Sequence, residues 1–331
     1  MIDLQLLQVE KGGNPEVVRE SQRKRFASVE LVDEVLSLYK NWVTLEFQLN
    51  QMQQEVNAIQ KVITTKKKAK EDADAELAQK KEQDAKIADF KPKVAEAERE
   101  MRLKAGTIGN IVGDKVPVSE TEDDNLVTKT WHPDGPNGQF EKKDHFLSHH
   151  EVMYRLDLFD TERGAKISGH RGFFLTGDGV DLNQALINYG LDFLRKKEYK
   201  KIMTPFMMRK EHMAKTAQLD QFDEELYKVT GDEDDKYLIA TSEQPISAFH
   251  SNEWFDRPAE QLPIKYAGYS TCFRKEAGSH GKDTWGIFRV HQFEKIEQFC
   301  ITDPASSWDM LDHMLANSCL LYTSPSPRDL S

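Results

Sequence analysis

The sequence predicts an α+β chain in which a long antiparallel helical hairpin, an arm of coiled-coil type, precedes a domain built on antiparallel strand hairpins. Three observations support this prediction. Apolar residues repeat in two interleaved heptad series between Leu31 and Ile63, a stretch rich in glycine, proline and acidic residues follows the helical half, and alternating strand patterns flank a glycine-rich loop between Ser270 and Cys300. The predicted parts are a helical arm at residues 1–110, a linker at 111–130 and a second domain at 131–319. Residues 320–331 change abruptly in character and are interpreted as a non-native tail that resembles mis-joined coding sequence.

Composition and charge exclude several classes of protein. The chain has 331 residues, of which 31% are charged, and its net charge is −11. It contains no run of about 18 apolar residues, which excludes a transmembrane helix. Its start is acidic from Asp3 onward and is unlike a signal or transit peptide. The cysteines are too few and scattered for a disulfide framework, so we expect a cytoplasmic protein without membrane contact.

No metal site is predicted. His145, His149 and His150 are close in the sequence, but no cysteine or acidic residue stands at a spacing that would complete a ligand set. We interpret these histidines as structural or surface residues.

The first predicted element is the helical arm. Two apolar series with heptad spacing define its outgoing limb: Leu31, Leu38, Leu45, Met52 and Ile59, and then Val35, Trp42, Leu49, Val56 and Ile63. Two further series, beginning at Ile87 and Phe90, predict a limb that returns along the first. At about 1.5 Å per residue the outgoing limb would extend roughly 50 Å. Pro92 lies inside the returning limb and predicts a kink.

Lysines cluster at the predicted tip of the hairpin. Between Lys61 and Lys104 there are 13 bases and 10 acids, although the whole chain is acidic. The tip carries Lys61, Lys66, Lys67, Lys68 and Lys70. A solvated helical face explains such a run, and so does contact with nucleic-acid phosphates, which supplies affinity without sequence specificity. Both interpretations remain open on the residues alone.

The second domain is predicted from shorter signals. Residues 181–195 have a helical pattern formed by Leu182, Leu186, Tyr189 and Phe193, and a strand at 200–207 is interrupted by Pro205. A strand at 237–240 leads into a helix that begins near residues 241–245, and another amphipathic helix is expected at 307–316. This mixture predicts an α+β domain.

The hairpin between Ser270 and Cys300 carries the strongest chemical signal. Because strand side chains alternate between faces, polar and aromatic residues gather on shared faces: Arg274 and Glu276 on the ascending strand, and Arg289, His291, Phe293, Lys295 and Glu297 on the descending strand. A solvated outer face is one explanation. The long glycine-rich, basic loop at 277–286 favours a nucleotide site instead, since arginine suits phosphate, carboxylate an exocyclic amine and an aromatic ring a base.

These segments carry a family resemblance. Residues 273–281 and 286–297 resemble the second signature motif of class II aminoacyl-tRNA synthetases in its seryl form. Residues 239–245 are similar to that family's serine-binding loop, 182–205 to its first motif and the helical hairpin to its tRNA-binding arm. The resemblance covers about residues 1–317. The residues of its motifs resemble those of the eukaryotic cytosolic branch of the family.

The resemblance implies an overall fold and activity. The second domain would be a class II antiparallel-sheet catalytic domain that activates L-serine with ATP and Mg²⁺ and transfers it to tRNA(Ser). The tip lysines would contact the tRNA. A homodimer is also implied, because Pro205 and its strand resemble the part of the first motif that packs across a dimer.

The resemblance further assigns roles at the ATP. Arg274 would neutralise the α-phosphate while the serine carboxylate attacks it, Glu276 would accept a hydrogen bond from the adenine amine, and Phe293 would stack on the adenine. Arg289 would add positive charge near the phosphates. The residues implied to bind ATP are Arg274, Lys275, Glu276, Arg289, Val290 and Phe293.

A serine site is implied beside it. Thr241 and Glu243 would hold the serine ammonium, with Ser242 between them, and Glu297 would accept a hydrogen bond from the serine hydroxyl. The residues implied to bind serine are Thr241, Ser242, Glu243, Arg274 and Glu297. On the residues alone, Thr241 and Ser242 are also suited to cap the following helix. Alanine would leave the buried carboxylate unpaired, which would reject it.

The end of the chain departs from the family pattern. No stretch after Cys300 resembles the third motif, whose arginine contacts the ATP γ-phosphate. We therefore expect a C-terminally truncated form of the enzyme, and we expect that the 331-residue chain alone does not sustain serine-dependent ATP–pyrophosphate exchange. The alternative is a non-catalytic tRNA-binding or coiled-coil interaction protein derived from such an enzyme.

Overall fold

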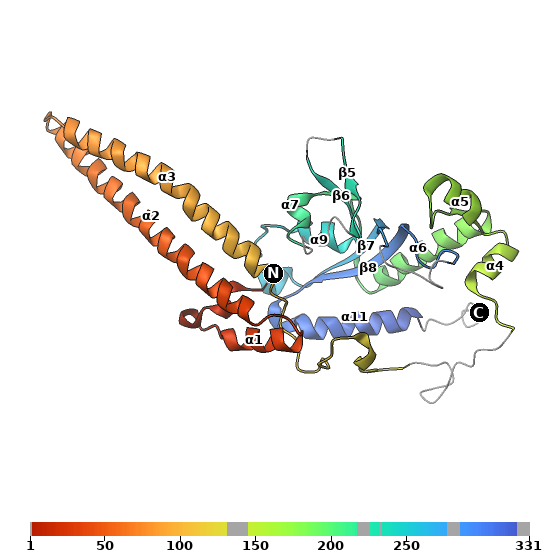
Figure 1. The fold of residues 1–331 in the computed structure, drawn as a ribbon. Coiled ribbons are helices and arrows are strands. Elements are labelled where there is room, and N and C mark those ends of the chain that lie inside the picture. Colours follow the sequence, from red (N-terminus) through yellow and green to blue (C-terminus); the bar gives the residue numbers. More distant parts are fainter. Residues whose placement is uncertain (1, 131–144, 217–224, 232–233, 277–284, 323–331) are drawn as a thin grey trace. The chain divides into compact units, whose positions relative to one another are not determined.

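The computed structural model describes residues 2–130, 145–216, 225–231, 234–276 and 285–322. The chain divides into two compact units, Met1–Thr130 and Trp131–Ser331 (Figure 1). Within the described residues, no helix has both the length and the apolar composition needed to cross a membrane.

The first unit begins with short helical segments and continues into a long arm. Two 3-10 turns, η1 (Leu4–Leu7) and η2 (Val9–Lys11), precede α1 (Pro15–Lys24). The side chain of Asn14 caps α1 by accepting a hydrogen bond from the N–H of Glu16, and Pro15 occupies the first helical position, where no donor is needed. The arm consists of α2 (Glu30–Lys68) and α3 (Asp74–Ala105), and η3 (Glu122–Asp124) follows it.

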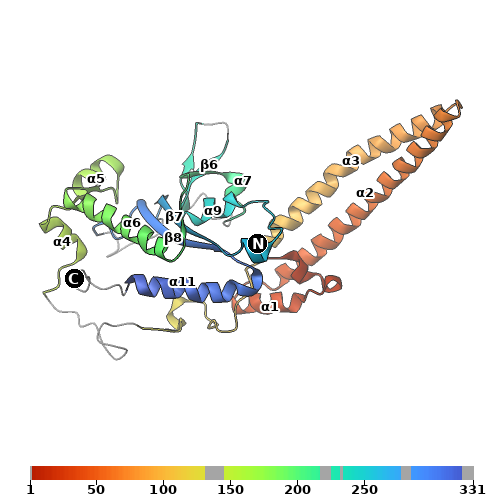
Figure 2. The same ribbon diagram turned by 180° about the vertical axis from the view of Figure 1, so that it is seen from behind.

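The two arm helices form the predicted antiparallel hairpin, which Figures 1 and 2 show from opposite sides. Every member of the two heptad series of α2 is buried or half-buried, whereas Val43, Phe47 and Val62, which belong to neither series, are exposed. The predicted seam is therefore confirmed. Its 39 residues give α2 a length of about 58 Å at 1.5 Å per residue. α3 continues through Pro92, which is exposed, as one helix.

The apolar core of the first unit lies at the base of the arm. It combines the N-terminal segment with α1 and the ends of both arm helices: Ile2, Leu7, Val18, Val32, Val35, Ala105 and Ile108. Polar contacts tie the chain after α3 to α1, because the Ser21 hydroxyl donates to the carbonyl of Asn110 at 3.0 Å and accepts from the N–H of Val112 at 2.9 Å. The base of the hairpin is thereby anchored while its tip projects into solvent.

The second unit combines helices with small sheets. Its first half contains α4 (His149–Arg155), β1 (Phe159–Asp160), α5 (Thr161–Ser168), β2 (Phe174–Leu175), α6 (Asp178–Lys196), β3 (Lys200–Met203), β4 (Met207–Arg209) and α7 (Lys210–Met213). Its second half contains β5 (Lys228–Val229), β6 (Lys236–Leu238), α9 (Glu243–Phe249), α10 (Pro258–Gln261), β7 (Ile264–Phe273), β8 (Gln292–Ile301), η6 (Pro304–Ser306) and α11 (Ser307–Tyr322). The strands pair as β1-β2, β4-β6-β5 and β3-β7-β8, and all pairs are antiparallel except β3 with β7.

The β7–β8 hairpin is the framework of the second unit. Its register places Gly268 opposite Glu297 and Ser270 opposite Lys295. One face of β8 is covered by helices, since Ile296 lies against Gly190 of α6, and Asn317 of α11 donates to Gln298 Oε1 at 3.0 Å. Alternation therefore directs Phe293, Lys295 and Glu297 to the opposite face.

The ends of these strands correct one sequence prediction. β7 ends at Phe273 and β8 begins at Gln292, so Arg274, Glu276, Arg289 and His291 lie outside the strands. Glu276 has a left-handed backbone with φ of 52°. The alternation of strand side chains therefore does not determine how these four residues are oriented, and their positions depend on tertiary contacts.

The predicted helix at 181–195 is present as the longer α6, but its packing face differs from the predicted apolar stripe. Leu182, Leu186 and Tyr189 are exposed, while Ile187 and Leu194 are buried. The strand expected at 200–207 is split at Pro205 into β3 and β4, which belong to different sheets. The helix expected at 307–316 continues as α11 to Tyr322.

Candidate active site

The loop at residues 239–243 lies beside the end of β7. The N–H of Phe273 donates to the carbonyl of Ile239 at 2.8 Å, which attaches the loop to this strand. Ser242 is buried and precedes the first residue of α9. Gly268 permits the approach, because a Cβ at this position would lie 2.7 Å from Ser242 Oγ. Backbone packing thus brings the loop onto the sheet face that carries Glu297.

Glu297 is the centre of a polar cluster. Its Oε2 accepts hydrogen bonds from Ser242 Oγ at 2.5 Å and from the Glu243 N–H at 2.9 Å. Thr241 Oγ1 lies 2.9 and 2.8 Å from the two carboxylate oxygens, and Lys295 Nζ donates to Oε1 at 2.8 Å. A carboxylate has about four lone-pair sites. The donors among the described residues therefore already occupy this carboxylate, and a serine hydroxyl would have to replace one of them.

The hydroxyl of Ser242 serves the carboxylate rather than the helix. Ser242 is the N-cap residue of α9, yet its side chain makes no hydrogen bond to the helix backbone. The N–H of Glu243 instead points to Glu297 and, at 3.3 Å, to Thr241 Oγ1. Ser242 does occupy the predicted N-cap position of α9. The prediction that its side chain caps the helix is wrong.

The environment keeps Glu297 ionised. Burial by itself would raise the pKa of this carboxyl, but hydrogen bonds from Lys295, Ser242 and Thr241 outweigh burial and hold the pKa below the ordinary value of 4.5. The cluster is thus arranged around a negative charge at neutral pH. Such a carboxylate can accept from a hydroxyl or an ammonium group but cannot donate.

A cation and an aromatic ring lie next to each other near the loop end of the hairpin. The guanidinium of Arg274 stands over the ring of Phe293, with 5.3 Å between its Cζ and the ring centroid. His291 Nδ1 lies 2.9 Å from the Arg274 carbonyl, which can only accept, so this nitrogen carries the proton. The contact fixes the backbone of Arg274, whose side chain is exposed. This pair can present a positive charge beside a stacking surface.

Glu276 and Arg289 form an ion pair although neither lies in a strand. Arg289 Nε donates to Glu276 Oε2 at 2.8 Å, and the Glu276 side chain is largely buried. Burial, followed by the negative charge of Glu276, raises the pKa of the nearby Tyr227. The residues expected to contact adenine and phosphate are thus already joined to each other.

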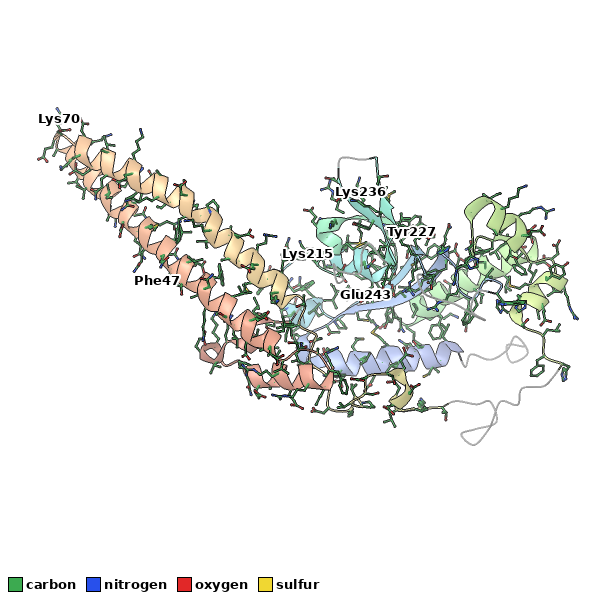
Figure 3. All side chains as sticks on the ribbon, viewed as in Figure 1. Phe47, Lys70, Lys215, Tyr227, Lys236 and Glu243 are labelled. Atoms are coloured by element: carbon green, nitrogen blue, oxygen red, sulfur yellow. The ribbon has the colours of Figure 1, made fainter. Side chains whose placement is uncertain are left out.

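The other implied site residues take different positions. Val290 is buried, and Lys275 is half-buried with its N–H donating to the carbonyl of Glu225 at 3.0 Å. Glu243 is exposed at the start of α9 and is labelled in Figure 3. The structure therefore brings together Thr241, Ser242 and Glu297, and separately Arg274 with Phe293 and Glu276 with Arg289.

A cavity of about 470 Å³ lies at the other side of the hairpin end. Among the described residues, its lining includes Arg171, Tyr227, Phe273, His291 and Glu294. None of the residues implied to bind ATP or serine belongs to that lining. The polar cluster around Glu297 is therefore separate from this cavity.

The tip of the arm presents most of its lysines to solvent. Lys61, Lys67, Lys68 and Lys70 are exposed, and Figure 3 shows Lys70 at the far end of the hairpin. Lys66 differs, because its ammonium pairs with Glu76 across the turn at 2.5 Å. The positive charge available to a partner at the tip thus comes mainly from the four exposed lysines.

Sequence reasoning placed Lys295 on the same face as Glu297 but gave it no role. The structure shows that Lys295 Nζ contacts both Glu297 and, at 2.9 Å, Thr241 Oγ1. Strand parity was the signal that could have identified it. The histidines of α4 instead make ring contacts, His149 with Phe288 and His150 with Trp285. The described part of the chain contains no group of three His, Cys, Asp or Glu side chains placed to hold a metal ion.

Comparison with known proteins identifies both units. The sequence model of the seryl-tRNA synthetase N-terminal domain matches residues 1–112, and that of the tRNA synthetase class II core domain (G, H, P, S and T) matches residues 227–325. The cytoplasmic serine–tRNA ligase of Schizosaccharomyces pombe is 56% identical over 98% of this chain and 71% of its own length. The corresponding protein of Saccharomyces cerevisiae is 52% identical with the same coverage.

Solved structures agree with these relatives. The cytoplasmic serine–tRNA ligase of Naegleria fowleri in complex with AMP has a TM-score of 0.79 and 46% identity, over 98% of this chain and 73% of that one. The seryl-tRNA synthetase of Pyrococcus horikoshii complexed with ATP has a TM-score of 0.81 and 33% identity, over 97% of this chain and 74% of that one. With both units matched, and with this identity over nearly its whole length, the chain belongs to the seryl-tRNA synthetase family.

Proposed function

We propose that this chain carries the machinery that activates L-serine with ATP and transfers it to tRNA(Ser). The observation that carries the proposal is the Glu297 cluster, where a carboxylate, two hydroxyls and an ammonium converge next to the hairpin end that holds Arg274 and Phe293. The relatives named serine–tRNA ligase and the neighbours named with AMP or ATP support the same activity.

In the proposed activation step, the serine carboxylate attacks the α-phosphate of ATP and pyrophosphate leaves. No side chain has to act as a base, because the attacking carboxylate is already ionised, so the protein contributes positioning and charge. Arg274 would stabilise the negative charge that builds on the α-phosphate, and Phe293 would support the adenine. Arg289 would serve the phosphates while its contact with Glu276 orients that carboxylate toward the adenine amine.

In the proposed serine site, Glu297 receives the serine hydroxyl, and Thr241 and Glu243 receive the ammonium. At Thr241 Oγ1 the ammonium would take the place of the Glu243 N–H, whose contact is the longer of the two at 3.3 Å. The serine hydroxyl would replace the Thr241 hydroxyl, whose single hydrogen is shared between both carboxylate oxygens and is therefore the most weakly held donor. When alanine is present, the Glu297 carboxylate keeps its hydrogen bonds from Ser242, the Glu243 N–H and Lys295. The free-energy cost of binding alanine is therefore smaller than the cost of leaving a buried charge fully unpaired.

Mg²⁺ enters the proposal only with ATP. Among the described residues, the carboxylate that contacts Arg289 is that of Glu276, with which Arg289 forms an ion pair. The residues around the phosphates would therefore supply positive charge and not a pair of carboxylate ligands. Mg²⁺ typically keeps several waters and is held largely by the phosphates, where it would neutralise the charge of the leaving pyrophosphate.

The arm would bind the tRNA. Exposed Lys61, Lys67, Lys68 and Lys70 place positive charge at the tip of a hairpin about 58 Å long, and such contacts release counterions from the nucleic-acid backbone. Residues 1–112 match the N-terminal domain of this family.

A cytoplasmic homodimer is proposed as the assembly. Apolar Leu182, Leu186 and Tyr189 are exposed along α6, and Met203 and Met207 are exposed on β3 and β4. An exposed apolar face of this kind is typical of a surface that a second copy covers. The relatives from Schizosaccharomyces pombe and Saccharomyces cerevisiae are named cytoplasmic, which supports the location.

The test is ATP–pyrophosphate exchange dependent on serine. The chain spans 71% of the length of its Schizosaccharomyces pombe relative, so residues 1–319 would be joined to the C-terminal segment of that relative and assayed beside the 331-residue chain. We expect exchange with serine, and not with alanine, in the extended chain. An extended chain that binds tRNA but shows no exchange would contradict the proposal and favour the non-catalytic alternative.

A further inference from the structure

Lys295 joins two elements of the candidate site. Its Nζ donates to Glu297 Oε1 on β8 at 2.8 Å and to Thr241 Oγ1 in the loop before α9 at 2.9 Å. The side chain of Lys295 is 29% exposed and that of Glu297 is 19% exposed. The pair is therefore partly withdrawn from water, unlike the surface ion pairs whose contribution is small.

The contact determines how the hydroxyl of Thr241 is used. A hydroxyl has one hydrogen and two acceptor lone pairs, whereas an ammonium can only donate. Lys295 and the N–H of Glu243 both point to Thr241 Oγ1, at 2.9 and 3.3 Å. The hydrogen of Thr241 must then point to the carboxylate of Glu297. Lys295 thus sets the direction of this hydrogen bond before serine binds, and its contact with Oε1 of Glu297 remains when the serine hydroxyl replaces that of Thr241.

The same ammonium holds one side of the carboxylate. Oε2 of Glu297 faces Ser242 and the N–H of Glu243, and Oε1 faces Lys295 and Thr241. The last torsion of a glutamate side chain is broad and is fixed only by its contacts. Without Lys295, Oε1 would keep only the shared hydrogen of Thr241 among these contacts, and the carboxylate plane would rotate more freely.

We propose that Lys295 is a positioning residue for amino-acid recognition, which holds Glu297 and Thr241 in the arrangement that distinguishes the hydroxyl of serine from the methyl group of alanine. The inference rests on the proposed function and deepens it. Lys295 acts through its two partners and needs no contact with the substrate.

Among the described residues, Arg274, Cys272 and Glu243 are further ionisable residues beside this cluster. Arg274 is permanently charged, and the thiol of Cys272, on β7, interacts electrostatically with Lys295, Glu297 and Arg274. Burial raises the pKa of that thiol, so it stays neutral at and below neutral pH. The Glu243 carboxylate, which is proposed to hold the serine ammonium, is the same in wild type and in Lys295→Met, so a difference between their serine profiles in acid would report on Glu297.

The test compares Lys295→Met and Lys295→Arg with the wild-type 331-residue chain. Calorimetric titrations with L-serine, L-alanine and ATP would run from about pH 3.5 to about pH 8, because Glu297 titrates below its ordinary pKa of 4.5. We expect Lys295→Met to weaken serine binding about 10-fold or more, to lower the serine-to-alanine ratio and to leave ATP affinity within about twofold. The acid limb of the serine profile should move to higher pH, because Glu297 loses a hydrogen bond that lowers its pKa. Lys295→Arg should recover much of the affinity.

The matched control is Lys228→Met, which removes a lysine that pairs with Asp235 at 2.9 Å in the β4-β6-β5 sheet. It should leave serine binding unchanged, and thermal melting of each variant would establish folding. The inference would be overturned if Lys295→Met bound serine and ATP more weakly by the same factor, or if its pH profile for serine did not move. It would also be overturned if Lys295→Arg recovered no serine affinity, because each of these results indicates a merely structural lysine. Wild-type serine affinity in Lys295→Met would also overturn it. Absence of serine binding by the wild-type chain would contradict the proposed function, and the inference with it.

Discussion

Replacing Glu297 by glutamine tests the proposed serine site most directly. The change keeps the shape of the side chain, removes its charge and turns one acceptor oxygen into a donor amide. In the structure, both oxygens face donors: Lys295 and Thr241 at Oε1, and Ser242 and the Glu243 N–H at Oε2. The two hydroxyls can rotate to accept from an amide, but the ammonium and the backbone N–H cannot. One donor is therefore left without its partner whichever way the amide lies.

The magnitude follows from these contacts. A hydrogen bond to a charged group contributes about 1.5–3 kcal/mol, and the serine hydroxyl would lose such an acceptor. At about 1.4 kcal/mol per factor of ten, kcat/KM for serine should fall about 10- to 150-fold. ATP is held by other residues, so its KM should change less than about twofold. The unpaired donor should cost about 1–3 kcal/mol of folding free energy and lower the melting temperature by several degrees.

The assay is pyrophosphate exchange by the extended chain, with serine and ATP varied separately and melting curves recorded in parallel. Glu294→Gln is the matched control, because it makes the same chemical change on β8 at an exposed position of the opposite face. A Glu297→Gln variant with wild-type dependence on serine would show that another group receives the hydroxyl. So would an equal loss in Glu294→Gln, since the effect would then come from the strand as a whole.

Further predictions address pH, the adenine, the arm and the assembly. Folding lowers the pKa of Glu297, so its charge stabilises the protein above its ordinary pKa of 4.5, and this stabilisation is lost as pH falls through the folded pKa. The difference in melting temperature between wild type and Glu297→Gln should therefore shrink in acid. A difference that stays constant with pH would contradict this. Phe293→Leu should raise KM for ATP about 3- to 10-fold in the exchange assay and leave KM for serine unchanged, because only the stacking surface is lost. Changing Lys67, Lys68 and Lys70 together to Glu should weaken tRNA binding in a filter assay and make the affinity less dependent on salt. Changing Lys66 should have a smaller effect, because Lys66 is already paired with Glu76. An unchanged affinity at low salt would refute the role of the tip. Leu186→Lys on α6 should shift the chain toward monomer in sedimentation experiments, and an unchanged mass would argue against this face as the dimer contact.

The helical arm shows how far local pattern reaches. Heptad spacing depends only on which residues follow one another, and a helix turns those spacings into one stripe, so the seam from Leu31 to Ile63 could be predicted residue by residue. The same reasoning gave the existence of α6 but not its packing face. Leu182 and Leu186 form an apolar stripe at helical spacing, yet Ile187 and Leu194 are the buried residues. Periodicity cannot tell which of two apolar stripes meets the sheet and which is left for another partner.

Local pattern in the sequence predicts the helical hairpin and the antiparallel β7–β8 pair, and the family resemblance predicts the residues of the candidate site. How those residues meet depends on contacts between segments that are distant in the chain. Glu297 and Ser242 are far apart in the chain, and their contact depends on Gly268, where the absence of a side chain lets the loop approach β7. Arg274 and Glu276 leave the strand before alternation can direct them, so Phe293 and Arg289 determine where they point. The physical reason is that repeat and alternation are properties of local backbone geometry, whereas close approach and charge pairing arise between segments that only folding brings together.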